Sequence, residues 1–160
     1  MENNHDKVVN SANITEFMTF ELGAMKYAIE LPKIKEILTY PDNITILPNT
    51  ESWVKGLINS RGEVVPILDI RIKFRTGEIV YNESTTIITV TTEDKRMIGI
   101  VVDKVDDVQK LDTSLLAPAS EMGSGIPSRY LKGYIRLDNN QMLVIMDIEK
   151  VVAKSELEDL

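Results

Sequence analysis

One hairpin pattern occurs twice in this chain, and the duplication limits the fold more than any other feature. Lys55-Gly56-Leu57-Ile58 is matched 77 residues later by Lys132-Gly133-Tyr134-Ile135. After a turn in each copy, Ile67-Leu68-Asp69-Ile70 is matched 78 residues later by Ile145-Met146-Asp147-Ile148. Short strands at this spacing, without a long helix between them, favour two small barrels or one sandwich.

Short apolar segments separated by turn residues extend this plan along the chain. The expected strands cover residues 17–22, 25–31, 54–59, 64–70, 85–91, 97–103, 132–136 and 142–148. Pro32 either ends the second strand or opens a short helix through Ile37. A fainter repeat, offset by 71 residues, aligns Ala28–Ile37 with Gly99–Val108. Residues 112–130 are rich in turn formers and are expected to be mostly irregular.

Both ends of the chain differ from this strand pattern. Residues 1–14 are polar and are expected to form a disordered tail. Near the other end, apolar residues recur at helical spacing among Lys and Glu, which predicts a short amphipathic helix over 149–158. We therefore expect an ordered, all-β region over 15–160, whose two halves share one plan.

The segment from Met97 to Asp103 is apolar on both faces. Ile98, Ile100 and Val102 alternate with Met97 and Val101. A strand with one solvated face would alternate apolar with polar residues instead. The pattern predicts that each sheet covers a core of its own and also packs against a second element.

Composition excludes several classes of function. The chain has no cysteine, so disulfides and thiolate metal sites are excluded and a reducing cytoplasm is expected. Its single histidine, His5, lies in the polar tail, so no Ser-His-Asp set or histidine acid–base pair can form. The net charge of −7 disfavours nucleic acid, and no apolar run approaches the ~20 residues that span a bilayer. The largest basic cluster, Arg71, Lys73 and Arg75, is expected to be solvated surface.

Asp69 and Asp147 occupy matching positions in the two copies and allow two interpretations. A pseudo-symmetric pair of aspartates can share a proton in acid proteolysis. That chemistry uses glycine-bearing loops, which neither aspartate has here. The favoured interpretation is that each aspartate ends a strand and caps the following turn or helix.

Arg61-Gly62 forms the tip of the first hairpin. Gly62 is explained by the positive φ that a tight hairpin turn requires. Arg61 is either a solvated tip residue or a side chain presented to a partner, since arginine is enriched where interfaces gain most of their energy.

The same hairpin carries a resemblance to a known family. Its string KGLINSRGEVVPILDIR, residues 55–71, resembles the signature of CheW, the bacterial chemotaxis coupling proteins. Further segments resemble the family in the same order, namely residues 74–78, 81–83, 99–105, 130–133, 142–143 and 147–150. The resemblance extends from about residue 16 to the C-terminus.

The resemblance implies a CheW-like domain over 15–160 made of two packed, intertwined five-stranded SH3-like barrels, at about 15–82 and 83–150. It also implies an adaptor without catalytic activity, cofactor or metal. It also implies two partners, the cytoplasmic tips of chemoreceptors and the regulatory domain of the histidine kinase CheA. Such a protein would be cytoplasmic and recruited to receptor arrays at the inner membrane face, without inserting into the membrane.

The resemblance also implies which residues face the receptor. By position these are Ile34, Glu36, Gly56, Arg61 and Gly62, whereas no kinase-binding residue is assigned. The chain departs from the family at Ser60, which is polar where apolar residues are common, and at Pro41, which resembles an insertion.

Two alternatives to a stand-alone adaptor are considered. One is a hydrolase that uses the two matching aspartates, and the other is a CheW-like module of a longer signalling chain.

Overall fold

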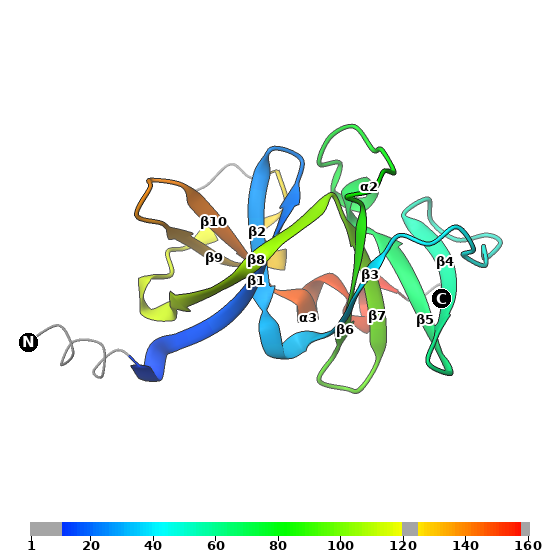
Figure 1. The fold of residues 1–160 in the computed structure, drawn as a ribbon, viewed down its shortest axis with the longest axis horizontal. Helices are drawn as coiled ribbons and strands as arrows, with labels where there is room; N and C mark the ends of the chain where they lie inside the picture. Colours follow the sequence, from blue (N-terminus) through cyan, green and yellow to red (C-terminus); the bar gives the residue numbers. More distant parts are fainter. Residues whose placement is uncertain (1–10, 120–124, 158–160) are drawn as a thin grey trace, which may run out of the picture.

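In the described part of the chain, ten strands form two five-stranded sheets, which lie side by side in the computed structural model (Figure 1). The structure describes residues 11–119 and 125–157. Sheet A has the strand order β8-β1-β2-β10-β9, and its strands are β1 (Ile14–Leu22), β2 (Met25–Glu30), β8 (Lys104–Asp112), β9 (Leu131–Arg136) and β10 (Met142–Met146). Sheet B has the order β3-β6-β7-β5-β4, and its strands are β3 (Ile34–Thr39), β4 (Val54–Ser60), β5 (Glu63–Asp69), β6 (Thr86–Thr91) and β7 (Met97–Val102). The prediction of two five-stranded β units is confirmed.

The two sheets are built on the same plan. Within each sheet the neighbouring strands pair antiparallel, except for one parallel pair. The parallel pair is β2 with β10 in sheet A and β5 with β7 in sheet B. The hairpin β4–β5 of sheet B therefore corresponds to the hairpin β9–β10 of sheet A, which is the repeat seen in the sequence.

Strands are exchanged between the two halves of the chain. After the hairpin β1–β2, the chain crosses and β3 pairs with β6 in sheet B. After the hairpin β6–β7, it crosses back and β8 pairs with β1 in sheet A. The faint 71-residue repeat relates these two crossings. Each sheet thus contains strands from both sides of the expected boundary at 82–83. That boundary divides the sequence into two halves, but it does not divide one sheet from the other.

Three apolar clusters form the core, and the largest lies between the sheets. Ile98, Ile100 and Val102 of β7 belong to this central cluster, together with residues of sheet A such as Phe20. Val101 faces the other way, into a cluster enclosed by sheet B. A third cluster is enclosed by sheet A. The expected burial of both faces of β7 is explained by these two cores.

A glycine in each repeated hairpin lets another segment approach the strand closely. Gly56 has φ +137°, and a Cβ at this position would collide with the carbonyl oxygen of Thr45. Gly133 has φ +147°, and a Cβ there would collide with the carbonyl oxygen of Ala117. In each case that segment forms an isolated antiparallel bridge to the residue after the glycine. The repeated Lys-Gly pair marks the same crossing of two backbones in both units.

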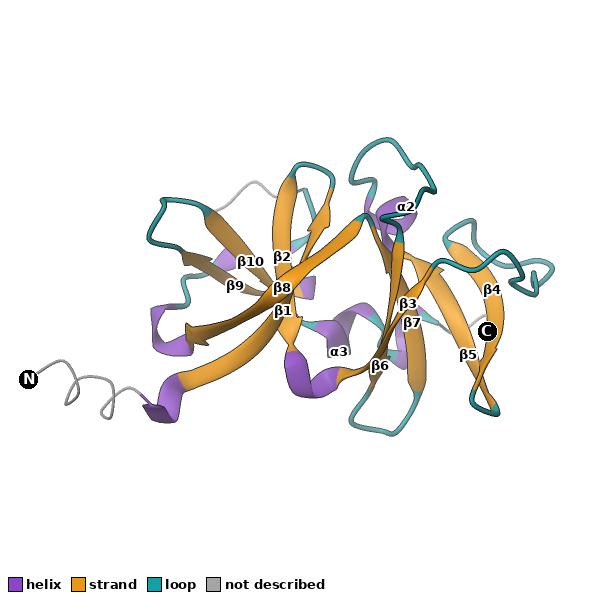
Figure 2. Cartoon of the chain, viewed as in Figure 1, coloured by secondary structure: helices purple, strands orange, loops and turns teal. Residues whose placement is uncertain are grey.

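Short helical segments connect the strands (Figure 2). They comprise α2 (Ile70–Phe74), α3 (Ile148–Val151) and 3-10 turns η1 (Ser11–Asn13), η2 (Leu31–Lys33), η3 (Thr113–Leu115), η5 (Ser128–Tyr130) and η6 (Lys154–Glu156). Helix α3 lies between the two sheets, and its buried Ile148 and Val151 belong to the central cluster.

Several boundaries differ from those expected. The predicted tail covers residues 1–14, but η1 and the start of β1 lie within it, and residues 1–10 are outside the described part. Pro32 sits in the single turn η2, so the helix through Ile37 is wrong and β3 occupies its place. In place of the predicted helix over 149–158, the structure has the short α3 from Ile148 followed by η6, and residue 158 lies outside the described part. Strand β8 was not predicted.

Candidate functional site

The tip of the β4–β5 hairpin is a two-residue turn made by Arg61 and Gly62. Their φ angles are +54° and +85°, and Ser60 pairs with Glu63 across the turn. Two successive positive φ values are typical of the turn that suits the twist of a tight hairpin. The backbone N–H of Gly62 donates to Oδ1 of Asn59 at 3.1 Å. The turn therefore needs Gly62 and holds Arg61 at the outermost point of the hairpin.

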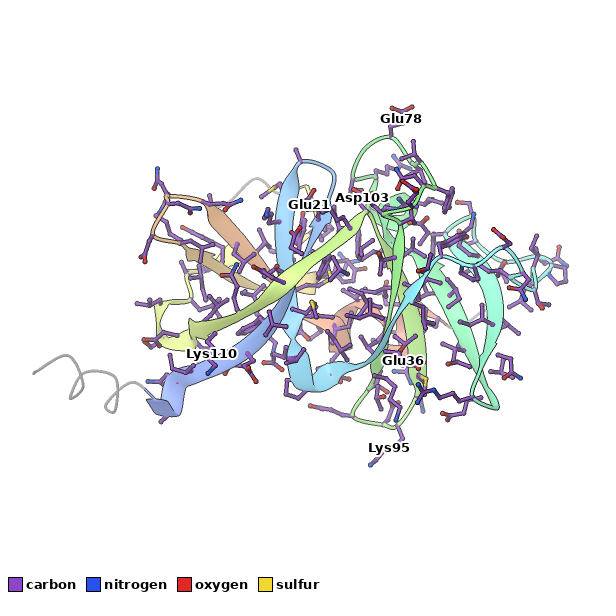
Figure 3. All side chains as sticks on the ribbon, in the orientation of Figure 1. Glu21, Glu36, Glu78, Lys95, Asp103 and Lys110 are labelled. Carbon is purple, nitrogen blue, oxygen red and sulfur yellow. The ribbon has the colours of Figure 1, made fainter. Side chains whose placement is uncertain are left out.

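Glu36 connects this tip to the neighbouring strand β3. Its Oε2 lies 2.9 Å from NH2 of Arg61, and its Oε1 accepts a hydrogen bond of 2.8 Å from Oγ of Ser60. The Glu36 side chain is 17% exposed and that of Arg61 is 80% exposed. Glu36 lies on the flank of sheet B (Figure 3). An exposed ion pair contributes at most about 1 kcal/mol to stability, so the pair orients the guanidinium more than it stabilises the fold.

A groove of about 720 Å³ lies beside the hairpin, and we call it the hairpin groove. Leu38 of β3 contributes to one wall, and Leu57, Ile58 and Arg61 of the hairpin contribute to another. Val64, which is 63% exposed, also lines the groove. Apolar side chains beside an exposed guanidinium suit a helix that presents an apolar stripe and a carboxylate.

Gly56 contributes to this groove indirectly. It is buried on β4, where the strand has an irregular register between Val54 and Gly56. The close crossing described above joins Leu57 to Thr45 through two backbone hydrogen bonds of 2.8 and 2.9 Å. Thr45 is itself a groove residue. Gly56 therefore fixes one wall of the groove, and its own surface is covered.

The structure brings three of the five predicted residues together. Arg61 and Gly62 form the hairpin tip, Glu36 of β3 contacts it through Arg61, and Gly56 supports the groove wall. Ile34 lies at the start of β3 and packs against the central cluster between the sheets. It is partly exposed and is not among the residues that line the hairpin groove.

Asp69 is buried in a network of charged and polar groups. It is fully buried, caps α2 by accepting from the backbone N–H of Arg71, and accepts from both Nε and NH2 of the same arginine. The hydroxyl of Tyr81 donates to its Oδ2 at 2.8 Å. Asp103 accepts from NH1 of Arg71 at 2.9 Å. Both carboxylate oxygens of Asp69 are thus occupied, which leaves no free group for the proton-sharing chemistry of an acid protease.

These contacts shift the pKa values of Arg71 and Tyr81. Burial acts to lower the pKa of Arg71, but its hydrogen bonds to Asp69 and Asp103 outweigh burial and raise it. The pKa of Tyr81 is raised by burial first and then by its hydrogen bond to Asp69. The expectation that Arg71 belongs to a solvated basic cluster is therefore wrong, because the arginine is 1% exposed.

Asp147 occupies the position in the second copy that corresponds to Asp69. It precedes α3 at the N-cap position, but its side chain makes no capping hydrogen bond. Asp69 and Asp147 resemble each other more in their backbone hydrogen bonds than in their side-chain contacts. The N–H of Asp69 donates to the carbonyl of Trp53 at 2.7 Å, and that of Asp147 to the carbonyl of Tyr130 at 2.8 Å. Capping by the side chain therefore holds for Asp69 alone.

The sequence did not identify the buried network or most of the groove wall. Arg71 follows Asp69 by two residues, and that spacing at the start of a helix was the only local signal for their contact. The other partners come from residues 80, 81 and 103. Within residues 11–119 and 125–157, no group of three or more His, Cys, Asp or Glu side chains is arranged to hold a metal ion. In the same residues, no helix is long and apolar enough to cross a membrane.

Comparison with known proteins places these features in a family. The family model described as a CheW-like domain matches residues 16–156. Chemotaxis protein CheW of Klebsiella aerogenes is 39% identical over 142 residues, which cover 89% of this chain and 84% of that protein. Chemotaxis protein CheW of Bacillus subtilis is 27% identical, covering 87% of each. The crystal structure of the scaffolding protein TtCheW from Thermoanaerobacter tengcongensis has the same fold, with a TM-score of 0.74, 24% identity, and coverage of 82% and 83%.

Proposed function

We propose, from the premise that this chain belongs to the CheW family, that its hairpin groove receives a helix of a chemoreceptor tip. The chain is a non-enzymatic chemotaxis scaffold that couples receptors to the kinase CheA. Its work is therefore to hold two partners at once. We place it in the cytoplasm, at receptor arrays on the inner face of the membrane.

The exposed Arg61–Glu36 pair is the observation that carries the proposed receptor site. A guanidinium has five N–H donors, and the ion pair with Glu36 uses only part of them. The remaining donors face solvent at the rim of an apolar groove. A receptor helix could place its apolar stripe on Leu38, Leu57 and Val64 and a carboxylate on Arg61, which would fix its register.

The other predicted positions have supporting roles in this proposal. Gly62 allows the turn that presents Arg61, and Gly56 holds the groove wall in place. Ile34 would extend the apolar contact along β3, toward the junction of the sheets. Coupling of the receptor to the kinase then has a physical basis. The adaptor binds both, so a conformational change in the receptor shifts the populations of the kinase's conformational states.

Replacing the tip arginine tests the receptor site. We expect Arg61→Ala or Arg61→His to weaken binding of a receptor-tip fragment by about tenfold, the loss that a charged anchor at an interface typically causes. Thermal unfolding should be nearly unchanged because Arg61 is exposed. Co-sedimentation of the adaptor with receptor tips and a CheA-type kinase would measure both the ternary complex and kinase activation.

Arg136→Ala is the matched control. Arg136 is an exposed arginine at the corresponding hairpin of sheet A, where its NH1 donates to Oδ1 of Asn140 at 3.1 Å. We expect this variant to bind receptor tips like the original chain. Equal binding by the Arg61 variants and the original chain would remove Arg61 from the receptor site.

A further inference from the structure

A second, smaller hollow lies where the end of α2 meets η5. Its volume is about 270 Å³, and it is lined by Lys73, Phe74, Arg75, Pro127, Arg129 and Tyr130, among others. Helix α2 follows the last paired residue of β5 in sheet B, whereas η5 leads into β9 of sheet A. We call this hollow the cationic pocket. It is distinct from the hairpin groove, with which it shares no lining residue.

The cationic pocket contains two arginines without an ion pair to any carboxylate of the described residues, although the charge of Arg129 does act on the nearby Glu156. Lys73 is paired with Glu156, but neither Arg75 nor Arg129 forms an ion pair with a carboxylate among residues 11–119 and 125–157. Both arginines are exposed. On a chain with a net charge of −7, such a local excess of positive charge attracts anionic groups.

Arg129 is held in place by the aromatic ring beside it. Its guanidinium carbon lies 4.4 Å from the centre of the Tyr130 ring, and its NH2 donates to the Tyr130 hydroxyl at 2.6 Å. A guanidinium fixed in this way loses little conformational freedom when it binds a carboxylate through two parallel hydrogen bonds.

Arg75 occupies a backbone position that glycine would fit better. It ends α2 in the left-handed conformation, with φ +53° and ψ +53°. This conformation is strained for a residue with a side chain. The fold would be served by glycine or asparagine here. The arginine therefore adds a charge at a strained position, which favours a binding role over a structural one.

The chain already shows which kind of group this cluster accepts. Glu156 of η6 pairs with Lys73 Nζ, and its Oε1 accepts a hydrogen bond of 2.9 Å from the hydroxyl of Tyr130. The next residue, Leu157, packs against the central cluster. A carboxylate followed by an apolar side chain thus already contacts Lys73 and Tyr130. Arg75 and Arg129 line the pocket without an ion pair to a carboxylate of the described residues.

We propose that the cationic pocket binds an acidic segment of a partner protein, with a Glu or Asp carboxylate between Arg75 and Arg129. An adjacent apolar side chain of the segment would rest on Phe74 and Pro127. Because the pocket is formed by elements of both sheets, a bound segment would contact both units of the scaffold. This site is additional to the receptor groove and does not depend on it.

Fluorescence anisotropy with a labelled peptide, Glu-Leu-Glu-Asp-Leu-Glu, tests the proposal on the full chain. We expect saturable binding that weakens as salt is added, because both partners are charged. The double variant Arg75→Gly/Arg129→Gln should bind at least tenfold more weakly. The single variant Arg75→Gly also relieves the left-handed strain, so its unfolding temperature should be equal to or higher than that of the original chain. Weaker peptide binding by this variant would therefore not be due to a loss of folding.

The matched control, Lys110→Gln/Arg136→Gln, removes two positive charges elsewhere. Lys110 lies on β8, at the far side of sheet A from α2 (Figure 3), and Arg136 ends β9. We expect this control to bind the peptide as the original chain does. Equal loss in the control and the pocket variant would show a general charge effect and overturn the proposal.

Two other anions distinguish the source of the ligand. Inorganic phosphate at the concentration of the peptide should not displace it, and vesicles of phosphatidylcholine and phosphatidylserine should not sediment the protein. Displacement by equimolar phosphate would show a simple anion site and overturn the peptide assignment. Vesicle binding that requires Arg75 and Arg129, without peptide binding, would assign the pocket to a membrane surface and overturn it as well.

Discussion

Gly56 and Gly133 are the residues on which the two repeated hairpins depend most directly. Each has a positive φ and lies against the carbonyl oxygen of a crossing segment. Two separate costs therefore accompany a side chain there, namely backbone strain and collision. The collision cannot be relieved by moving a flexible side chain, because the opposing atom is a backbone carbonyl oxygen. Both copies of the repeat therefore have glycine at this position.

Alanine substitution separates these two costs. We expect Gly56→Ala and Gly133→Ala each to lower the free energy of unfolding by about 2–4 kcal/mol, measured by urea denaturation. Gly77→Ala is the control, since Gly77 has φ +148° but nothing lies within 4 Å of an added Cβ. Its cost should be about 1–2 kcal/mol, from backbone strain alone. Equal losses at all three positions would contradict the collision argument.

Arg71 illustrates how a buried charge depends on its neighbours. We expect Arg71→Met to lower the free energy of unfolding by about 3–5 kcal/mol, because it leaves the buried Asp69 without its main partner. Arg61→Met, at an arginine that is 80% exposed, should change stability by no more than about 1 kcal/mol, the most that its ion pair with Glu36 contributes. Urea denaturation of both variants would check this, and similar effects at the two arginines would contradict it.

At the scale of elements, β3 and β8 are the strands that the sequence failed to predict. Each lies at the edge of its sheet. Most exposed positions of β8 are charged, whereas those of β3, Lys35, Ile37 and Thr39, mix charged, apolar and polar residues. Charges on edge strands prevent pairing with other chains, but they also hide the apolar alternation by which a strand is recognised. The central strands β6 and β7 are apolar on both faces and were predicted closely.

The hairpin of the candidate site was predicted because its turn depends on adjacent residues. Arg61-Gly62 and the returning strand follow from local conformational preferences. The groove wall around Thr45 and the burial of Arg71 were not predicted, because both result from contacts between distant segments. In the buried network, Tyr81 comes from the loop before β6 and Asp103 from the connection between β7 and β8. Local sequence patterns do not predict that either residue lies near Arg71.

The 3-10 turn η6 should respond to acid through Glu156. Burial acts to raise the pKa of this carboxyl, but hydrogen bonds with Lys73 and Tyr130 outweigh burial and lower it. A lowered pKa contributes stability above the ordinary value of 4.5, and this stability is lost as pH falls through the lower, folded value. The contribution of Glu156 should therefore be present at neutral pH and absent at strongly acidic pH.

Comparing the chain with Glu156→Gln isolates this effect. We expect the variant to be less stable by about 1.5–3 kcal/mol at pH 7, which is typical of a hydrogen bond to a charged group. At acidic pH below the folded pKa of Glu156 the two proteins should unfold at nearly the same urea concentration. A difference that persists unchanged into acid would show that the charge of Glu156 does not stabilise η6.

At the scale of the whole molecule, the exchange of strands makes the halves interdependent. Sheet A takes β8, β9 and β10 from the second half, and sheet B takes β3, β4 and β5 from the first. The central cluster also draws on both sheets. We therefore expect that neither half of the chain, divided near residue 82, folds alone.

Expressing residues 1–82 and 83–160 as separate chains tests this interdependence. We expect neither fragment alone to unfold cooperatively in circular dichroism, because each lacks partners for its strands. Mixing them should restore a cooperative transition. The intact chain cleaved by a protease between 82 and 83 is the control and should remain folded. A single fragment with its own cooperative transition would contradict the prediction.

The pairing of β2 with β10 has a consequence for how the protein is made. Lys26 pairs with Leu143, so a strand near the start of the chain receives its second neighbour from near the end. During translation, β1 and β2 leave the ribosome long before β10 exists. One edge of this early hairpin stays open through most of synthesis, and the loss of a short C-terminal segment would leave it open permanently. A premature stop codon shortly before residue 142 would thus disable the N-terminal half of sheet A, although every residue of that half is present.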